Sequence, residues 1–207
     1  MAYRETASVR ARKEAARDRI LAAALQLVSQ KGFSAVSVSD VAELAGVATG
    51  SVYRHFASKA ELFSHVFRSA SQREVDQVAQ AVSQPGTAGE RLQAALTRFG
   101  RRALRGKQLA WALIAEPIDP LVDSDRLEYR RRYAEVFEQV IRQGVMSGEF
   151  PPQDARVTSA ALVGAMAETL VGPLSPHRDQ QPLDENQLIH SILTLCMRAI
   201  TGKEIQP

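Results

Sequence analysis

Residues 46–62 decide the fold of this chain and read G-V-A-T-G-S-V-Y-R-H-F-A-S-K-A-E-L. This stretch predicts a short helix over about 49–56, directly after a tight turn at Gly46 and Val47. A second short helix is expected before the turn, over about 38–45, because apolar residues recur there at helical spacing. Two short helices separated by a tight turn are typical of a helix-turn-helix motif, in which the second helix can enter the major groove of DNA.

The expected second helix carries hydrogen-bonding side chains on its outer face. Val52 and Phe56, four residues apart, are expected to face inward and to hold the helix on its domain. Gly50 lets the backbone approach a partner closely. Packing into a hydrophobic core does not by itself explain so short a helix with a polar outer face. The side chains that can reach bases or phosphates are Thr49, Ser51, Tyr53, Arg54 and His55.

Capping residues extend the helical pattern on both sides of the motif. Ser37 and Asp40 have the spacing of a capping box, with Asp in place of Glu, and are expected to begin the helix over 38–45. Ser58 and Glu61 form a second box that begins a longer helix. Gly32 is expected to end a first helix in the left-handed conformation. The apolar stripe of that first helix consists of Ile20, Ala24, Leu27 and Val28.

The remainder of the chain also has helical spacing, with no alternating strand pattern and no internal repeat. Pro117 and Pro120 are expected to end one helix, and Gly172 and Pro173 another. A loop over 175–182 precedes the last helix. We therefore predict an all-α fold of about nine helices. The later helices are expected over about 90–105, 107–116, 123–146, 154–170 and 184–201.

The charge of the chain divides unevenly along its length. The 207 residues carry 26 Lys and Arg against 23 Asp and Glu, a formal net charge of +3. Residues 1–59 hold nine of the basic and five of the acidic side chains, and residues 60–207 hold the other 17 and 18. A basic end joined to a near-neutral remainder favours a module that binds a polyanion. We therefore predict a DNA-binding domain with a basic N-terminal arm over 1–59 and a larger helical domain over 60–207.

The composition argues against several other classes of protein. Charged residues at 24% and apolar residues at 45% are ordinary values for a globular chain. The single cysteine, Cys196, excludes a disulfide within the chain and a cysteine-based zinc cluster. No uncharged apolar run approaches the roughly 18 residues of a membrane span, and the first residues form no apolar signal segment. The sequence thus predicts a cytoplasmic protein without membrane association, metal or cofactor.

Two other classes of function are alternatives to a ligand-responsive regulator of DNA. An enzyme is disfavoured because no Ser-His-Asp or Cys-His arrangement, metal-ligand spacing of histidines or Gly-rich phosphate loop is apparent, although scattered side chains can converge in space. No residue is therefore predicted to be catalytic. An architectural or activating DNA-binding protein that takes no small ligand is the other alternative. A solid core in the larger domain would favour it, and an apolar cavity with one or two polar anchors would argue against it.

Residues 46–62 resemble the signature of TetR-type (tetracycline-repressor-like) regulators, roughly G-V-S-x-G-x-L-Y-x-H-F-x-S-K-x-x-L. Residues 20–24, with Gly32 and Phe33, are similar to the first helix of that family, and residues 38–42 to its second. The resemblance covers about residues 16–67. The sequence departs from the family pattern at Ala48, where a capping serine is common, and Thr49 is the residue that could cap instead.

The resemblance implies a double-stranded DNA operator as partner and places residues of the motif against it. It puts Gly50 within the recognition helix, Tyr53 and His55 on phosphates, and Thr49, Ser51 and Arg54 on base edges. The residues expected to contact the DNA backbone from the neighbouring helices are Ser37, Ser39 and Lys59. The basic lead-in over 4–19 is expected to be a disordered arm that follows the minor groove, or a solvated, frayed terminus.

The resemblance further implies a repressor that a small, largely apolar effector releases from its operator by a population shift. Ligand binding would move the helix that begins at Lys59 and change the spacing of two recognition helices. Plain core packing explains each candidate pocket residue taken alone. Glu116, Tyr129 and Tyr133 are the candidate polar anchors. The candidate pocket residues are Phe67, Phe99, Trp111, Ile114, Glu116, Tyr129, Tyr133, Phe137 and Met166.

A homodimer built on the last two helices is also implied by the resemblance. Small residues over 154–170 allow helices to approach closely, and the last helix is apolar on two faces, which predicts burial on both sides. A helix central in a monomer core is the alternative, and Cys196 is expected to be buried and unreactive. The residues expected at the dimer interface are Ala161, Gly164, Ala165, Leu188, Ile192, Leu195 and Ala199.

The arginines of the larger domain are expected to lie on solvated helix faces, paired with nearby glutamates. A phosphate-bearing ligand, such as an acyl thioester of coenzyme A, would give some of them a function. These arginines are Arg98, Arg101, Arg102, Arg105, Arg130, Arg131 and Arg132.

Overall fold

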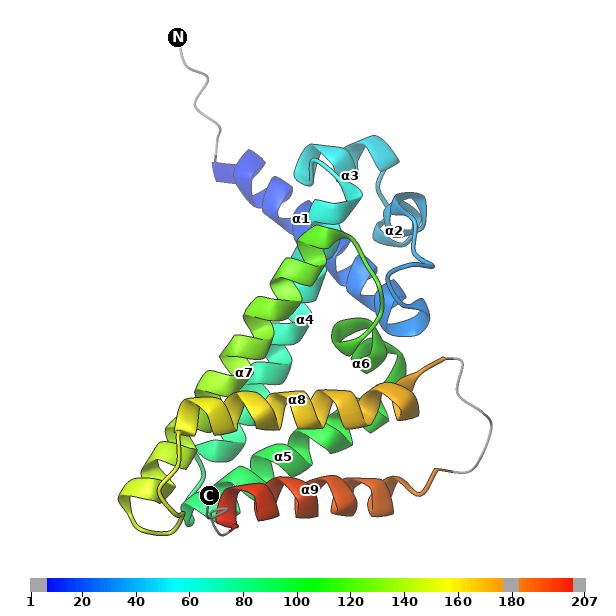
Figure 1. The fold of residues 1–207 in the computed structure, drawn as a ribbon. Helices are drawn as coiled ribbons and strands as arrows, with labels where there is room; N and C mark the ends of the chain where they lie inside the picture. Colours follow the sequence, from blue (N-terminus) through cyan, green and yellow to red (C-terminus); the bar gives the residue numbers. More distant parts are fainter. Residues whose placement is uncertain (1–6, 177–182, 203–207) are drawn as a thin grey trace.

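The computed structural model describes residues 7–176 and 183–202, and these form nine α-helices without a strand (Figure 1). The predicted all-α fold is thereby confirmed. Residues 1–6, with Arg4 of the predicted arm, and most of the predicted loop over 175–182 lie outside the described residues. The helices are α1 (Ala7–Lys31), α2 (Val38–Ala45), α3 (Thr49–His55), α4 (Lys59–Val82), α5 (Ala88–Arg105), α6 (Lys107–Ile114), α7 (Pro120–Met146), α8 (Ala155–Leu174) and α9 (Glu185–Thr201).

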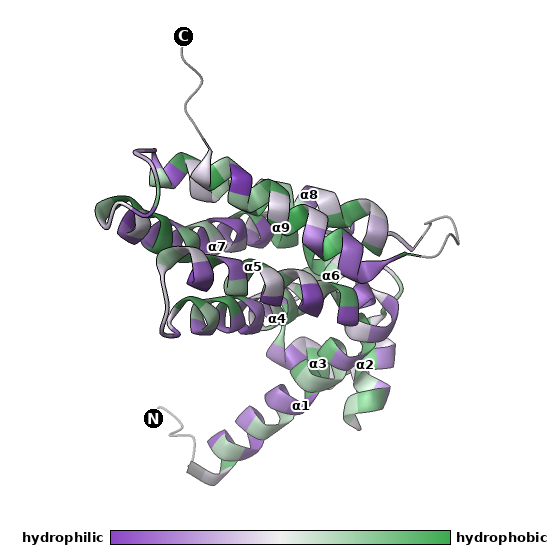
Figure 2. Ribbon diagram, turned by 90° about the horizontal axis from the view of Figure 1, so that it is seen from below, coloured by the Kyte–Doolittle hydropathy of each residue, from purple (hydrophilic) through white to green (hydrophobic). Residues whose placement is uncertain are grey.

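Helices α1 to α3 form a small bundle, and the later helices form a larger one. Helix α4 leads from the small bundle into the larger bundle. α4 runs beside α7 for much of its length, and α8 contacts α5, α6, α7 and α9. The N-terminal half of α1 projects from the body in both views, and α9 lies at the opposite end of the molecule (Figures 1 and 2). Helix α4 is therefore in contact with both bundles.

Two hydrophobic cores hold these bundles together. The first contains Ile20, Val41 and Phe56 of the small bundle, and it extends through Phe67 of α4 to Tyr129 of α7. The second core lies among α4, α5, α7, α8 and α9. The first core thus crosses the predicted boundary at residue 59, and helix α4 belongs to the packing of both parts. The division into domains over 1–59 and 60–207 stays a prediction.

Side-chain caps start the helices of the motif as its sequence predicts, with one difference. Ser37 and Asp40 form a reciprocal box, in which the Asp40 N–H donates to Ser37 Oγ at 3.1 Å and the Ser37 N–H donates to Asp40 Oδ2 at 3.0 Å. These bonds from Ser37 lower the pKa of the Asp40 carboxyl. At the start of α4, Ser58 Oγ accepts from the Glu61 N–H at 3.0 Å, but the Glu61 carboxylate accepts from the N–H of Ala57. The second box is therefore shifted by one residue and is not reciprocal.

The basic lead-in is helical where the structure describes it, so the expectation of a disordered arm is wrong for residues 7–19. α1 begins at Ala7, and its first turns are exposed. An ion pair between Arg10 Nε and Glu14 Oε1 at 3.1 Å spans one turn of this segment. The segment is rich in Ala, Arg, Lys and Glu, which have high helix propensity, and this explains a helix without an apolar stripe.

Proline acts differently from expectation at two helix ends. α8 continues through Gly172 and Pro173 to Leu174, because a proline in the last turn removes a single backbone donor there. Pro120 does not only separate helices but begins α7 at its first position, where its missing N–H costs nothing, and Asp119 is the N-cap.

Helix α8 is long and apolar enough, by length and composition, to cross a membrane, and no other described helix meets that test. Core helices of water-soluble domains meet the same test. Leu162, Met166 and Leu170 of α8 are buried in the second core, which accounts for part of its apolar character.

Gly144 of α7 allows a close approach of Phe150, which is itself buried. A Cβ atom at residue 144 would overlap the Phe150 ring. Gly144→Ala is therefore expected to lower the free energy of unfolding by about 1–3 kcal/mol through overpacking, measured by urea titration. Gly50→Ala is the control, because no heavy atom lies within 4 Å of a Cβ added there. Equal stability of the two variants would contradict the packing at Phe150.

Candidate DNA-binding surface and ligand cavity

Helix α3 presents a polar face to solvent and is held on the domain by two buried side chains. Val52 and Phe56 are each 1% exposed, whereas Tyr53 is 50% exposed. Thr49, Gly50 and Arg54 are also exposed, and Ser51 and His55 are half-buried. The N-cap residue Ala48 makes no side-chain hydrogen bond, and Thr49 is the first residue of the helix proper. Thr49 therefore does not replace the capping serine, and its side chain is not engaged in a cap.

Cations from α1 and α3 gather at the end of the recognition helix. Arg54 Nη2 donates to Ser51 Oγ at 2.9 Å, which positions the guanidinium along the exposed face. Burial and the nearby positive charges of Lys13, Arg17 and Arg54 lower the pKa of His55, so its imidazole is neutral at neutral pH. Lys13 and Arg17 belong to the basic lead-in that is expected to act as an arm, but they are not among the residues predicted individually to contact DNA. Their spacing of four residues, on one face of a helix, is the signal that could have indicated them.

Arg17 also connects α1 to α4. Its guanidinium carbon lies 5.1 Å from the centre of the Phe56 ring, and its Nη2 lies 3.4 Å from both ring nitrogens of His65. Burial is the main cause that lowers the pKa of His65. Arg17 is thus partly a packing residue, and Lys13 is the freer cation of the two.

The residues of the neighbouring helices that are predicted to contact the DNA backbone also make contacts within the protein. Ser37 Oγ lies 2.8 Å from Ser39 Oγ and also caps α2, and Ser37 is half-buried whereas Ser39 is exposed. Lys59 is exposed at the start of α4, with its ammonium 5.1 Å from the centre of the Phe63 ring. Ser37, Ser39, Lys59 and the residues of α3 nevertheless share one end of the molecule.

A cavity of about 270 Å³ lies in the larger bundle, between α4, α5, α6, α7 and α8. Its volume is close to the lower end of the range of roughly 300–1,000 Å³ that is usual for small-molecule sites. Seven of the nine predicted pocket residues line it, namely Phe67, Phe99, Ile114, Tyr129, Tyr133, Phe137 and Met166. Trp111 is not among the lining residues. Lining residues that the sequence did not indicate include Ser71, Glu74, Leu109, Leu113, Arg126 and Val163.

Glu116 does not point into the cavity, and its predicted role as a ligand anchor is wrong. It is 5% exposed, and its carboxylate accepts from the Phe33 and Ser34 N–H groups, each at 2.9 Å, and from Ser34 Oγ at 2.7 Å. The carboxylate is therefore occupied by the turn between α1 and α2. A Cβ at Gly32 would lie 2.9 Å from both Glu116 oxygens, so the approach requires the glycine.

Arg126 joins the cavity wall to the end of α6. Its Nη2 donates to the Glu116 carbonyl at 2.6 Å, its Nε donates to the Leu113 carbonyl at 3.1 Å, and its Nη1 pairs with Asp123. Burial is the main cause that lowers its pKa. The guanidinium of Arg126 is thus held against the carbonyls at the C-terminal end of α6, where the helix dipole favours a positive charge.

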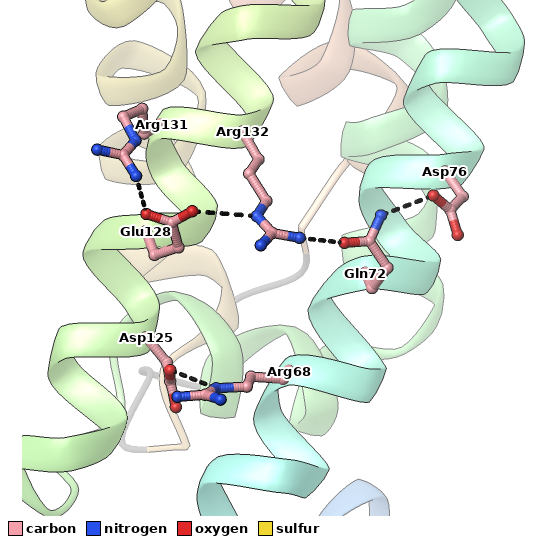
Figure 3. Close-up of polar contacts among 7 residues, drawn as sticks. All are labelled: Arg68, Gln72, Asp76, Asp125, Glu128, Arg131 and Arg132. Carbon is pink, nitrogen blue, oxygen red and sulfur yellow. Dashed lines mark hydrogen bonds and ion pairs between the residues drawn. The ribbon is translucent and has the colours of Figure 1, made fainter.

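Polar contacts also fasten α4 to α7 beside the cavity (Figure 3). Asp125 is buried and accepts from Arg68 Nε at 2.6 Å and from Ser64 Oγ at 2.7 Å. One turn further along α4, Gln72 Oε1 accepts from Arg132 Nη1 at 2.7 Å (Figure 3). Of the arginines expected on solvated faces, Arg131 and Arg132 pair with Glu128, whereas Arg102, Arg105 and Arg130 border the cavity.

The predicted interface residues divide between the surface and the core. Ile192 is 3% exposed and packs inside its own chain, so its assignment to an interface is wrong. A helix that is apolar nearly all round does not reveal which side its own chain covers. Leu195 is 54% exposed, and a Cβ at Gly164 would meet no heavy atom within 4 Å. Ala161, Gly164 and Ala199 are exposed, and Ala165 and Leu188 are half-buried. Cys196 is buried, which raises the pKa of its thiol.

Family comparisons agree with this arrangement. The model of "Bacterial regulatory proteins, tetR family" matches residues 20–66, and that of "Tetracyclin repressor-like, C-terminal domain" matches residues 85–171. Together they span well over half of the chain. The chain belongs to the TetR family of transcriptional regulators, which are DNA-binding proteins.

Individual relatives include a regulator of fatty acid metabolism and a transcriptional repressor. The fatty acid metabolism regulator protein of Bacillus subtilis is 23% identical over 192 residues, which are 89% of this chain and 95% of that protein. The repressor KstR of Rhodococcus jostii is 39% identical over 99 residues, 47% of this chain and 45% of that protein. The crystal structure of FadR from Bacillus subtilis in complex with stearoyl-CoA is similar with a TM-score of 0.74 and 22% identity, over 88% of this chain and 98% of that chain.

Proposed function

We propose that this protein is a homodimeric repressor of the bacterial cytoplasm that binds operator DNA through α3 and releases it when a small molecule occupies the cavity. The observation that carries this proposal is the cavity itself, because α4 lines it with Phe67 and begins at the recognition helix. An architectural protein without a ligand would have no use for this cavity. The larger helical domain thus serves ligand binding and dimerisation.

On the DNA side, we assign base contacts to Thr49, Ser51 and Arg54, and phosphate contacts to Tyr53 and His55. A neutral imidazole has one N–H that donates and one ring nitrogen that accepts. The N–H can donate a hydrogen bond to a phosphate oxygen. Lys13 extends the surface along α1, and a cation on an exposed helix can neutralise a phosphate without base specificity. Ser37, Ser39, Gly50 and Lys59 complete the surface.

Variants of two cations separate base contacts from phosphate contacts. Arg54→Ala is expected to reduce the preference for the operator over a mutated site by about tenfold or more. Lys59→Ala is expected to weaken binding to all sequences and to reduce the salt dependence by about one counterion. Fluorescence anisotropy with labelled duplexes at several salt concentrations measures both. Equal losses on every sequence for Arg54→Ala would remove it from the base-reading residues.

We infer that cavity occupancy reaches the DNA-binding helices by two connections. α4 forms one wall of the cavity and begins at Lys59, just after α3 ends, and α7 fastens it through Asp125. α6 supplies Leu113 to the cavity, and Glu116 just beyond it holds the turn between α1 and α2. A ligand that displaces α4 or α6 therefore changes the position of the recognition helix. Two recognition helices with altered spacing no longer match half-sites about one helical turn apart.

We infer that the effector is largely apolar, because aromatic and aliphatic side chains dominate the cavity wall. A related regulator binds stearoyl-CoA, which supports an acyl chain as the buried part. The test begins with genome-wide mapping of binding sites to obtain the operator. Anisotropy of that operator is then measured with acyl-coenzyme A added, and release of the DNA is expected. Unchanged binding over all chain lengths would contradict an acyl effector.

We propose that the outer faces of α8 and α9 join two protomers. These faces carry small or apolar exposed residues, including Gly164 and Leu195, and α8 and α9 contact each other. Small residues let helices of two chains approach closely. Two-fold symmetry would then present two α3 helices to one face of the duplex.

A further inference from the structure

Three hydroxyl groups of the cavity wall have no hydrogen-bond partner among the residues that the structure describes. Ser71 comes from α4 and is 3% exposed, and Tyr129 and Tyr133 come from α7. Within the described chain, no polar side-chain atom that is sealed from solvent lacks a partner. Each of the three hydroxyl oxygens therefore has some accessible surface, and all three residues line the cavity. An apolar cavity with a few unpaired polar groups is typical of a ligand site, in which those groups fix the ligand's orientation.

Aromatic packing, rather than hydrogen bonding, holds the two phenol rings in place. Tyr133 meets Phe99 edge to face, with ring centres 5.3 Å apart, and Tyr129 meets Phe67 in the same way at 6.1 Å. The guanidinium carbon of Arg132 lies 4.8 Å from the centre of the Tyr129 ring. The two tyrosines are one helical turn apart and share a face of α7. Their hydroxyls are thus positioned in advance and free to donate.

The charges around these hydroxyls favour a neutral acceptor over an ionised one. Arg102 donates to both carboxylate oxygens of Glu74, at 2.6 and 2.7 Å, so this pair on the cavity wall carries no net charge. Arg126 is engaged by Asp123 and by carbonyls at the end of α6. A carboxylate placed among the hydroxyls would lose its hydration without gaining an unpaired cation.

Two exposed cations, Arg105 and Arg130, also border the cavity. An anionic group at the other end of a ligand can lie near them in contact with water. Burial raises the pKa of Tyr129 and of Tyr133, so both phenols keep their protons at neutral pH and act as donors. The cavity thus suits a molecule with an apolar chain, a neutral acceptor within and an anionic group outside.

We propose that Ser71, Tyr129 and Tyr133 form a subsite for the carbonyl group of an acyl ester or thioester. A carbonyl oxygen has two lone pairs, so two of these hydroxyls can donate to it at once. The acyl chain lies among the aromatic residues that line the cavity. This inference rests on the proposed function and adds to it the group by which the effector is recognised.

The test compares lauroyl-coenzyme A with S-dodecyl-coenzyme A, a thioether with the same chain length and head group but no carbonyl. Isothermal titration of the full-length protein is expected to show about tenfold tighter binding of the thioester, since one net hydrogen bond is worth about 1 kcal/mol and unpaired hydroxyls add to the difference. Tyr133→Phe and Ser71→Ala are expected to reduce this preference several-fold and to leave thioether affinity unchanged. Ser69→Ala, at an exposed position of the same helix as Ser71 and outside the cavity wall, is the matched control and is expected to keep the full preference.

The outcomes distinguish the subsite from the proposed function. Equal affinity of the two probes for the unaltered protein would overturn the subsite, and so would a Tyr133→Phe variant that weakens both probes by the same factor. Release of operator DNA by either probe would still support an acyl effector in those cases. If neither probe binds, the acyl effector and the carbonyl subsite are both overturned.

Discussion

Leu195→Arg is expected to convert the protein to a monomer and to lower operator affinity by about 10²- to 10⁴-fold, the range lost when two linked contacts become one. Leu195 lies on α9 and is 54% exposed. If the outer faces of α8 and α9 join two protomers, an arginine there places an unpaired charge in the apolar contact. Each α3 would then bind a half-site alone.

A matched variant on another helix controls for the change in chemistry. Leu127 of α7 is 67% exposed, so Leu127→Arg adds the same charge outside the proposed interface. Sedimentation equilibrium at micromolar concentration and anisotropy with the operator measure both variants. We expect Leu127→Arg to remain a dimer with full affinity. A Leu195→Arg protein that still sediments as a dimer, or an unaltered protein that is a monomer, would contradict the interface.

The motif around α3 could be predicted from the sequence because its signals are local. The bounds of α2 and α3 follow from Ser37, Gly46 and the inward pair Val52 and Phe56, each of which acts within one or two turns. The same holds for most later helices, whose ends lie within a few residues of the expected ones. Local signals also explain the error at Pro173, where the cost of proline depends on its place in the turn.

The contacts between helices could not be predicted, because they depend on residues far apart in the chain. Glu116 meets Phe33 and Ser34 across 83 and 82 residues, and nothing in the sequence near Glu116 indicates a backbone partner. Ser71 is one of several polar residues in this part of α4, and the packing of α4 against α7 places it on the cavity. The spacing of apolar residues predicts that a helix face is buried, but it does not indicate whether the same chain or a second protomer covers that face. Ile192 shows this most directly.

Glu116→Ala is expected to lower the free energy of unfolding by about 3 kcal/mol, because a buried donor left without its acceptor costs about 1–3 kcal/mol. The Phe33 N–H is buried away from solvent, whereas the Ser34 groups are partly accessible. The negative charge is lost together with three hydrogen bonds, and hydrogen bonds to charged groups are the stronger ones. Urea unfolding followed by circular dichroism measures the effect.

Glu135→Ala provides the control, since Glu135 is exposed on α7 and the change should alter stability by less than about 0.5 kcal/mol. The comparison also tests the connection from α6 to the DNA-binding helices. If Glu116 connects cavity occupancy to the DNA-binding helices, Glu116→Ala should bind ligand with unchanged affinity under mild conditions in which it remains folded. The same ligand should then release less operator DNA from this variant than from the unaltered protein. An alanine variant with unaltered stability would mean that the turn between α1 and α2 finds other partners. Full ligand response in that variant would leave α4 and its contact with α7 as the path by which the cavity acts on α3.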